Sequence, residues 1–208
     1  MPSLLAVRPA VVDGRLILRF PDGSVVEGDV ELGEPVETSF FGRPVAGRLV
    51  VGPWSEALSG LAGASIRLVR TEREGDGSDR GPGAPVSLVS TGSLEALRAA
   101  PRATRPGDGR RVRMTIGVDS AEPHVEDGWM DARVRVGGAV VLVRDRVGRC
   151  AVTTRDPDSG ERDLETLDAI ASYREDVPSR EPLPFGVWCT VAEPGAVAVG
   201  DPVEVGAL

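Results

Sequence analysis

Cys150 and its neighbours are the strongest candidates for chemistry in this sequence. The segment RDRVGRCAVTTRDPDSGERD, residues 144–163, places one of only two cysteines between an apolar run and a turn-rich run. A thiol attacks or binds metal as its thiolate, which nearby arginines such as Arg149 and Arg146 stabilise. If 149–156 continues as a strand, Arg146 shares the face of Cys150 and Arg149 does not. Taken alone, these residues favour a buried structural cysteine.

Two hydroxyls and a tight turn follow the cysteine. Thr153 and Thr154 end the apolar run, and DPDSG (156–160) has the composition of a turn. Backbone N–H groups in such turns can hold an anion. We therefore expect residues 149–156 to form a strand that leads into an anion-binding turn, with an ordinary hairpin loop as the alternative.

A second group of titratable residues surrounds His124, the only histidine. With Glu122, Glu126 and Asp127 it has the residue types of a hard-metal site. The interpretation we favour is a solvated acidic loop. Three further residues of possible interest are expected in the core: Cys189, Trp129 and Trp188.

Composition excludes several classes of function. The chain has 208 residues and a net charge of −8, which argues against nucleic-acid binding through basic patches. It contains no lysine, so neither lysine-bound pyridoxal phosphate nor a P-loop lysine can be present. No apolar run approaches the ~20 residues that a membrane helix needs, and the N-terminus lacks the pattern of a signal peptide. We expect a cytoplasmic protein that is not bound to a membrane.

The first third of the chain has the pattern of short strands separated by turns. FPDGS (20–24) predicts a turn, because Pro fixes φ and Gly is permissive, and PWSEALSGL (53–61) predicts a short helix. The expected strands are 15–20, 24–32, 47–52 and 64–72.

The rest of the chain is denser in apolar residues. A strand at 85–90 leads into a helix at 91–100, and a second helix at 164–176 is expected to be capped by Asp163. The expected strands are 111–119, 131–146 as a hairpin turning at Gly137–Gly138, 149–156, 187–194 and 196–205. Many short strands with few helices predict a mainly β (α+β) fold, barrel-like, with two or three short helices.

The second half of the sequence resembles a known family. RCAVTTRDPDSGERDLETLDAIASYR followed by PFGVWCTVAEPGAVAVGDPVEV is similar to the MOSC domain, the molybdenum-cofactor sulfurase C-terminal family, which includes amidoxime-reducing proteins. The shared features are an Arg-Cys pair, Thr-Thr, an Asp-Pro-x-(Thr/Ser)-Gly turn, a helix ending in Tyr-Arg and a closing Val-Gly-Asp. PVSLVSTGSLEAL, RVRMTIGVD and AEPHVEDGWMDARVRVGGAVVLV precede them in the family's order. The resemblance covers residues 84–205, and 15–72 resemble more weakly the β-rich domain that precedes MOSC.

This resemblance implies a fold and a domain organisation. The family has a β-barrel-like core with a few helices. It implies a MOSC domain at 85–208. The charged, Gly- and Pro-rich composition of the preceding residues predicts a flexible loop at 73–84. Residues 1–72 would be a shortened β-rich segment that packs on the core.

The resemblance also implies a site. The family's cysteine, here Cys150, is thought to ligate molybdenum or to carry a persulfide. Arg113 takes the place of an arginine that helps to hold the anionic molybdenum-pterin cofactor. The site residues implied in this chain are Cys150 as catalytic residue and metal ligand, and Arg113, Thr115, Arg149, Thr153 and Thr154 as cofactor contacts.

Some positions depart from the family pattern. Thr115 replaces an asparagine, Gly148 replaces a small hydroxyl residue, and His124 stands where an aromatic or apolar residue is usual. The family's usual N-terminal opening is not found, so we expect a homodimer or a partner chain to complete the barrel.

The first functional hypothesis is a protein that binds molybdenum cofactor or carries sulfur on Cys150, with oxygen- or sulfur-atom transfer as its reaction. Its partners would be a small anionic ligand or a sulfur donor. The alternatives are a molybdenum-free MOSC-fold enzyme of a small-molecule pathway, and a non-catalytic barrel that binds a partner chain.

Overall fold

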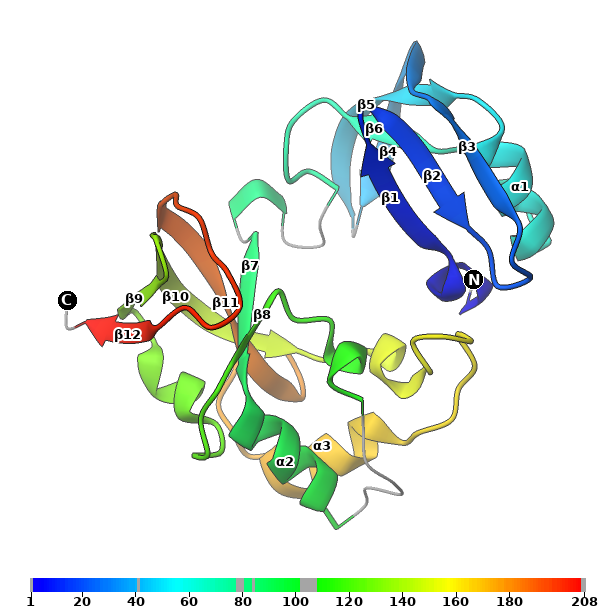
Figure 1. Ribbon diagram of the computed structural model, residues 1–208. Helices are drawn as coiled ribbons and strands as arrows, with labels where there is room; N and C mark the ends of the chain where they lie inside the picture. The colour runs from blue at the N-terminus through cyan, green and yellow to red at the C-terminus, as the bar shows by residue number, and fades with distance from the viewer. Residues whose placement is uncertain (1, 41, 78–80, 84, 102–107, 207–208) are drawn as a thin grey trace. The chain divides into compact units, whose positions relative to one another are not determined.

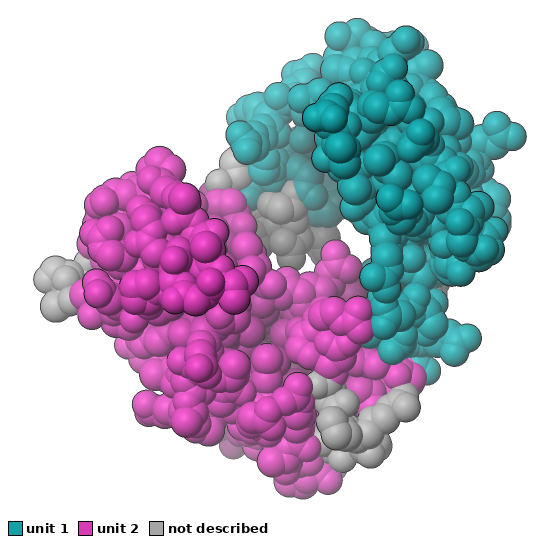
Figure 2. All heavy atoms as spheres, viewed as in Figure 1, with its two compact units in different colours: residues 1–82, 155–162 teal, residues 83–154, 163–208 magenta. Residues whose placement is uncertain are grey.

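The computed structural model describes residues 2–40, 42–77, 81–83, 85–101 and 108–206. The chain divides into two compact units (Figure 2). Unit 1 contains residues 1–82 and 155–162, and unit 2 contains residues 83–154 and 163–208. The expected domain boundaries at 72 and 84 stay predictions. Residues 78–80 and 84 of the expected flexible loop lie outside the described residues.

Unit 1 consists of two three-stranded antiparallel sheets and one helix (Figure 1). Its core is formed by Leu18, Val50, Trp54 and Leu58, with the Trp54 side chain fully buried. A first 3₁₀ turn, η1, spans Pro2–Ala6. The strands are β1 (Arg8–Val12), β2 (Arg15–Arg19), β3 (Val25–Asp29), β4 (Glu31–Phe40), β5 (Arg43–Val51) and β6 (Val69–Thr71).

The helix expected at 53–61 is confirmed as α1 (Trp54–Ala62), which ends at Gly63 in the left-handed conformation. Two strand predictions in this unit need correction. The strand expected at 24–32 is divided between β3 and β4, because the chain leaves the first sheet at Val30 and enters the second. Of the strand expected at 64–72, only β6 finds a partner, on β5.

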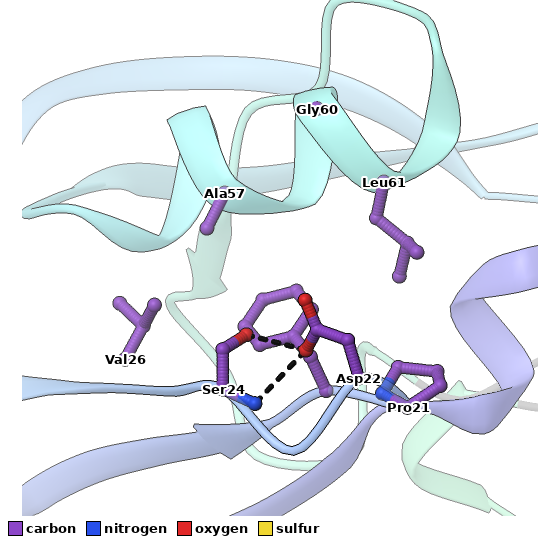
Figure 3. A pocket seen from close by; sticks show the side chains of 8 residues that line it. Pro21, Asp22, Ser24, Val26, Ala57, Gly60 and Leu61 are labelled. Atoms are coloured by element: carbon purple, nitrogen blue, oxygen red, sulfur yellow. Dashed lines mark hydrogen bonds between the residues drawn. The ribbon is translucent and has the colours of Figure 1, made fainter.

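The turn predicted at FPDGS joins β2 to β3 and borders an open cavity of ≈ 470 Å³ (Figure 3). The Asp22 carboxylate accepts hydrogen bonds from Ser24 Oγ at 2.6 Å and Ser24 N at 2.9 Å. These bonds lower the pKa of Asp22 below its ordinary value, the side-chain bond having the larger effect. The walls of the cavity are mainly apolar and come from the turn and from α1: Phe20, Pro21, Asp22, Ser24, Val26, Ala57, Gly60 and Leu61.

Unit 2 is built on one six-stranded sheet in the order β12-β9-β10-β11-β7-β8. Only β7 and β8 pair in parallel, and register shifts between β10 and β11 bend the sheet into a half-barrel. The strands are β7 (Val86–Ser90), β8 (Ile116–Val118), β9 (Arg133–Val136), β10 (Ala139–Gly148), β11 (Pro184–Glu193) and β12 (Val203–Gly206). The helices are α2 (Thr91–Ala99) and α3 (Thr166–Arg174), with 3₁₀ segments η3 (Gly109–Val112), η4 (Val125–Trp129) and η5 (Ala151–Thr154). The 3₁₀ segment η2 (Gly81–Gly83) spans the boundary between the two units.

The two faces of this sheet bury different apolar clusters. Leu88 of β7 and Val187 of β11 belong to one cluster, and Val89 and Phe185 belong to the other. Alternation along β7 therefore sends neighbouring residues into opposite clusters, as a strand buried on both faces requires. The mainly β, barrel-like fold expected from the sequence is confirmed. No helix within the described ranges is long and apolar enough to cross a membrane.

The hairpin expected to turn at Gly137–Gly138 is confirmed, since Ala139 pairs with Val136 across it. The helix expected at 91–100 is confirmed as α2. Of the strand expected at 111–119, only β8 is paired, and of the strand expected at 196–205, only β12.

Two local predictions near the cysteine are wrong. Residues 149–156 do not form a strand, because after Gly148 the chain enters η5, in which the amide of Thr153 binds the carbonyl of Cys150 at 3.1 Å. Asp163 does not cap a helix either. The residue at the start of α3 is Glu165, which makes no capping bond through its side chain.

The first turn of α2 lies against the chain segment that follows β8. The amide of Gly92 donates to the carbonyl of Ser120 at 2.7 Å. A Cβ on Gly92 would lie 2.6 Å from the carbonyl oxygen of Glu122 and 2.8 Å from that of Ser120. Only glycine permits this approach, which places the next residue, Ser93, inside unit 2.

We predict that Gly92→Ala destabilises the protein by about 2 kcal/mol, since an added methyl group must displace backbone atoms. The matched control is Gly117→Ala, because a Cβ at Gly117 meets nothing within 4 Å. Chemical denaturation monitored by tryptophan fluorescence measures both. Equal midpoints for the two variants would contradict the prediction.

Candidate functional site

Cys150 lies where β10 ends and η5 begins, and its side chain is exposed. The burial that the residues alone favoured is therefore wrong. The pairing of β10 with β11 stops at Gly148 opposite Pro184, and the amide of Arg149 binds the carbonyl of Pro182 at 3.2 Å. The chain then turns out of the sheet, so the thiol faces away from the core.

Arg149 points inward and binds the protein itself. Its Nε and Nη2 donate to the carbonyl of Phe185 at 2.9 and 2.6 Å. Its Nη1 donates to the carbonyl of Val112 at 2.8 Å, and Nη2 also lies 2.7 Å from the sulfur of Met114. A single guanidinium thus joins the cysteine segment, the end of η3 and the start of β11. Its predicted role as a direct cofactor contact stays a prediction.

Arg113 lies between Val112 and Met114, both of which Arg149 contacts. Its backbone has φ 49° and ψ 40°, the left-handed conformation. Its side chain is exposed, and no hydrogen bond or ion pair is found for it among the described residues. Because η3 and η5 contact each other, the segments that carry Arg113 and Cys150 lie together, and the predicted cofactor-binding role of Arg113 stays a prediction.

The three predicted threonines bind the protein through their hydroxyls. Thr153 Oγ1 donates to the carbonyl of Cys150 at 3.0 Å, and Thr154 Oγ1 donates to that of Ala151 at 2.7 Å. Both side chains are buried. Thr115 Oγ1 lies within hydrogen-bond distance of the amide and hydroxyl of Ser87, both at 3.2 Å. These residues fix the backbone around Cys150 and Arg113, and their roles as cofactor contacts stay predictions.

The turn expected to bind an anion carries its own carboxylate. Asp156 Oδ1 accepts from the amides of Asp158 at 3.0 Å and Ser159 at 2.8 Å. An Asx-type turn of this kind fills the N–H groups that an external anion would need. The anion-binding turn is therefore wrong for these two amides.

A buried ion pair that the sequence did not indicate holds η3 in place. Arg111 Nη1 and Nη2 donate to the two carboxylate oxygens of Asp163 at 2.7 and 2.8 Å. The Arg111 side chain is 6% exposed, so both ions need this partner. Fifty-two positions separate the two residues, and no local pattern links them. The interaction explains why Asp163 is not a helix cap.

The residues around His124 form neither a solvated loop nor a metal site. Glu126 is fully buried, and Asp127 forms ion pairs with Arg174 at 2.6 Å and Arg146 at 3.2 Å. The solvated acidic loop is therefore wrong for Glu126 and Asp127, while Glu122 is exposed as expected. No cluster of metal-ligating side chains is found in the part of the chain that the structure describes.

Cys189 is confirmed as a core residue. It is fully buried in the cluster that contains Val187, and Trp129 lies in the same cluster, as expected. Trp188, also expected in the core, is only half-buried. Burial raises the pKa of the Cys189 thiol from its ordinary 9.0 to about 12, which makes its thiolate scarce near neutral pH.

We predict that the folded protein takes up one equivalent of iodoacetamide at pH 8, on Cys150, while Cys189 stays unmodified. Each unit of pKa lowers the thiolate fraction about tenfold, and burial also blocks access to the reagent. Peptide mass spectrometry locates the label. Cys150→Ala should take up none until guanidinium unfolds the chain, and rapid native labelling of Cys189 would contradict the expected difference.

We predict that Arg149→Lys lowers the free energy of unfolding by about 3 kcal/mol, since an ammonium group cannot serve three acceptors in a fork. The matched control is Arg144→Lys, because exposed Arg144 makes one side-chain bond, to Thr190 at 3.2 Å. Its change should stay under about 0.5 kcal/mol. Urea titration measures both variants, and a tolerated Arg149→Lys would show that the fork is not needed.

Comparison with known proteins identifies relatives of this chain. The chain is 35% identical over 127 residues to mitochondrial amidoxime-reducing component 1 of Xenopus laevis, covering 57% of this chain and 35% of the relative. It is 34% identical over 126 residues to component 1 of Mus musculus and 35% identical over 125 residues to component 2 of Homo sapiens. The chain covers 36% of the length of each of these two. A family model described as the MOSC domain matches residues 77–204. Since this match spans more than half of the chain, the protein belongs to the MOSC domain family.

Proposed function

We propose that this MOSC domain binds a molybdenum-pterin cofactor through Cys150 and Arg113. The observation that carries the proposal is an exposed thiol and an exposed guanidinium on two segments that one half-buried arginine, Arg149, joins. A small anionic ligand that reaches Cys150 would meet Arg113 without first breaking an ion pair of that side chain.

The donor types fit such a cofactor. Thiolate is a soft ligand that suits molybdenum and sulfur chemistry, and a guanidinium suits phosphate through paired hydrogen bonds. Thr153 and Thr154 keep η5 in one conformation, so Cys150 is held before any ligand arrives. Preorganised donors reduce the reorganisation that binding requires.

The chain's own residues would hold and orient the group, with Cys150 as metal ligand, Arg113 at the phosphate, and Arg149 fixing the backbone of both. When bound, the cofactor supplies oxygen-atom transfer. The relatives' names, amidoxime-reducing components, support an N-oxygenated compound as the substrate class. Because the chain spans about a third of each relative's length, substrate and partners are part of this proposal.

The exposed thiol also favours a second function, sulfur carriage. Cys150 thiolate would attack the terminal sulfur of a donor persulfide. A sulfur–sulfur bond then forms on Cys150 as the donor's sulfur–sulfur bond breaks, and the donor leaves as its thiolate. The exchange is redox-neutral and needs no metal.

The cofactor proposal predicts molybdenum and pterin in protein purified from a molybdenum-replete host. Cys150→Ala and Arg113→Ala should each lower the bound amount at least about tenfold, the value of one charge-assisted contact. Mass spectrometry of the metal and fluorescence of the oxidised pterin measure it. The matched control is Arg135→Ala, an exposed arginine on β9, which should retain the cofactor.

A parent protein without molybdenum and pterin would contradict cofactor binding. Intact mass after incubation with a cysteine desulfurase and cysteine then tests the carrier function. The carrier function requires the mass of one added sulfur atom in the parent and none in Cys150→Ala. Equal adducts on both proteins would exclude Cys150 as the carrier.

A further inference from the structure

His124 occupies an unusual environment in unit 2. Its ring lies 5.7 Å from the ring of Tyr173 on α3 and 5.6 Å, edge to face, from that of Phe185 on β11. Both ring nitrogens are buried, and neither has a hydrogen-bond partner among the described residues. Its backbone has φ 58°, the left-handed conformation. The ring therefore packs through aromatic contacts, and these contacts give its two nitrogens no hydrogen bond.

Two further polar atoms near this ring lack partners within the described part of the chain. They are the hydroxyl of Tyr173 and Oε2 of Glu126. The other carboxyl oxygen of Glu126 accepts from Ser93 Oγ at 2.7 Å, and Ser93 Oγ accepts from the amide of His124 at 2.9 Å. Unsatisfied buried polar atoms are rare in folded proteins and call for an explanation.

The charges that face His124 come from three elements. Glu126 and Asp127 lie on η4, Arg174 lies on α3, and Arg146 on β10 contacts Asp127. Burial, and secondarily the charge of Arg174, lower the pKa of His124 below its ordinary 6.5, while Glu126 and Asp127 act in the opposite direction. The neutral ring is thus the form that this packing accepts. A protonated ring would carry two buried N–H donors, and neither ring nitrogen has a hydrogen-bond partner among the described residues.

The same residues support the anchor of the Cys150 site. Phe185 presents its ring to His124 and its carbonyl to two nitrogens of Arg149. Next to it, the carbonyl of Pro184 accepts from Arg174 Nε at 2.7 Å. The start of β11 therefore contacts both the ring of His124 and the guanidinium of Arg149. A displacement of Phe185 would move the carbonyl to which Arg149 donates two hydrogen bonds.

We propose that His124 is a proton-sensitive positioning residue of the Cys150 site, whose neutral ring holds Phe185 in place and whose protonated ring leaves that contact and loosens the Arg149 anchor. The inference deepens the proposed function, because it concerns the same site, but it requires no bound cofactor.

The direction of the pH effect follows from proton linkage. The pKa of His124 is lower in the folded form than the ordinary 6.5. Between these two pKa values a locally opened form therefore binds a proton at His124, whereas the closed form does not. The contribution to stability is fully present above pH 6.5. It is lost as pH falls towards the folded pKa, below which it changes no further. Between these limits the constant for local opening rises about tenfold per pH unit.

Hydrogen exchange of the full chain without cofactor tests the inference. Protection factors for residues 112–114 and 149–154, corrected for the intrinsic pH dependence of exchange, should fall by up to about tenfold per pH unit below 6.5. In His124→Phe, which keeps an aromatic ring and cannot titrate, they should stay level. Amides of β2 in unit 1 serve as the internal control and should stay level in both proteins.

A second variant and a second measurement keep the test decisive. His124→Asn is uncharged and tolerates the left-handed conformation, so it should also remove the pH dependence if the phenylalanine variant folds poorly. Because the chain has one histidine, its NMR titration is a single curve, and its midpoint should lie below 6.5 and coincide with the loss of protection. The inference would be overturned if protection fell in both variants as much as in the parent protein, or if it did not fall in the parent protein. Neither result depends on molybdenum content, so failure here is distinct from failure of the proposed function.

Discussion

The geometry of the candidate site depends on one partly buried fork of hydrogen bonds, that of Arg149. Its guanidinium reaches the carbonyls of Phe185 and Val112 and the sulfur of Met114. A carbonyl left without a donor in the interior is costly, so these segments stay together only while the guanidinium is present. The sheet ends at Gly148, so Arg149 and Cys150 both lie beyond it, and Arg149 binds inward while Cys150 is exposed.

Sequence reasoning reached the parts of the fold that local patterns determine. The glycine pair at 137–138 predicted the turn between β9 and β10, and the short helices expected at 53–61 and 91–100 are observed as α1 and α2. It failed at η5, since the hydroxyls of Thr153 and Thr154 bind carbonyls three residues back and favour a 3₁₀ turn over the strand that β-branched residues suggest. It also missed the pair of Arg111 and Asp163, because a contact between distant residues leaves no local pattern.

The sequence predicted which residues belong to the candidate site better than it predicted the role of each residue. Cys150 and Arg113 came from the family pattern, and the structure leaves both side chains exposed. The pattern could not separate a residue that meets a ligand from one that holds the backbone. Arg149 shows this limit, because the sequence alone does not tell whether a guanidinium next to a thiol binds an anion or a backbone carbonyl. Likewise, acidic residues of η4 read as solvated until Ser93, 33 positions from Glu126, is seen to bind it.

Arginine as the sole long-chain cation has a consequence for how this site responds to its surroundings. Arginine stays charged at every pH a folded protein meets, and carboxylates ordinarily titrate well below neutrality. Few kinds of side chain therefore change charge between pH 5 and 8. Histidine is the side chain whose ordinary pKa falls in that range, and this chain has only one, His124. Because its ring lies against Phe185, the residue whose carbonyl anchors Arg149, a proton bound there acts on a direct neighbour of that anchor.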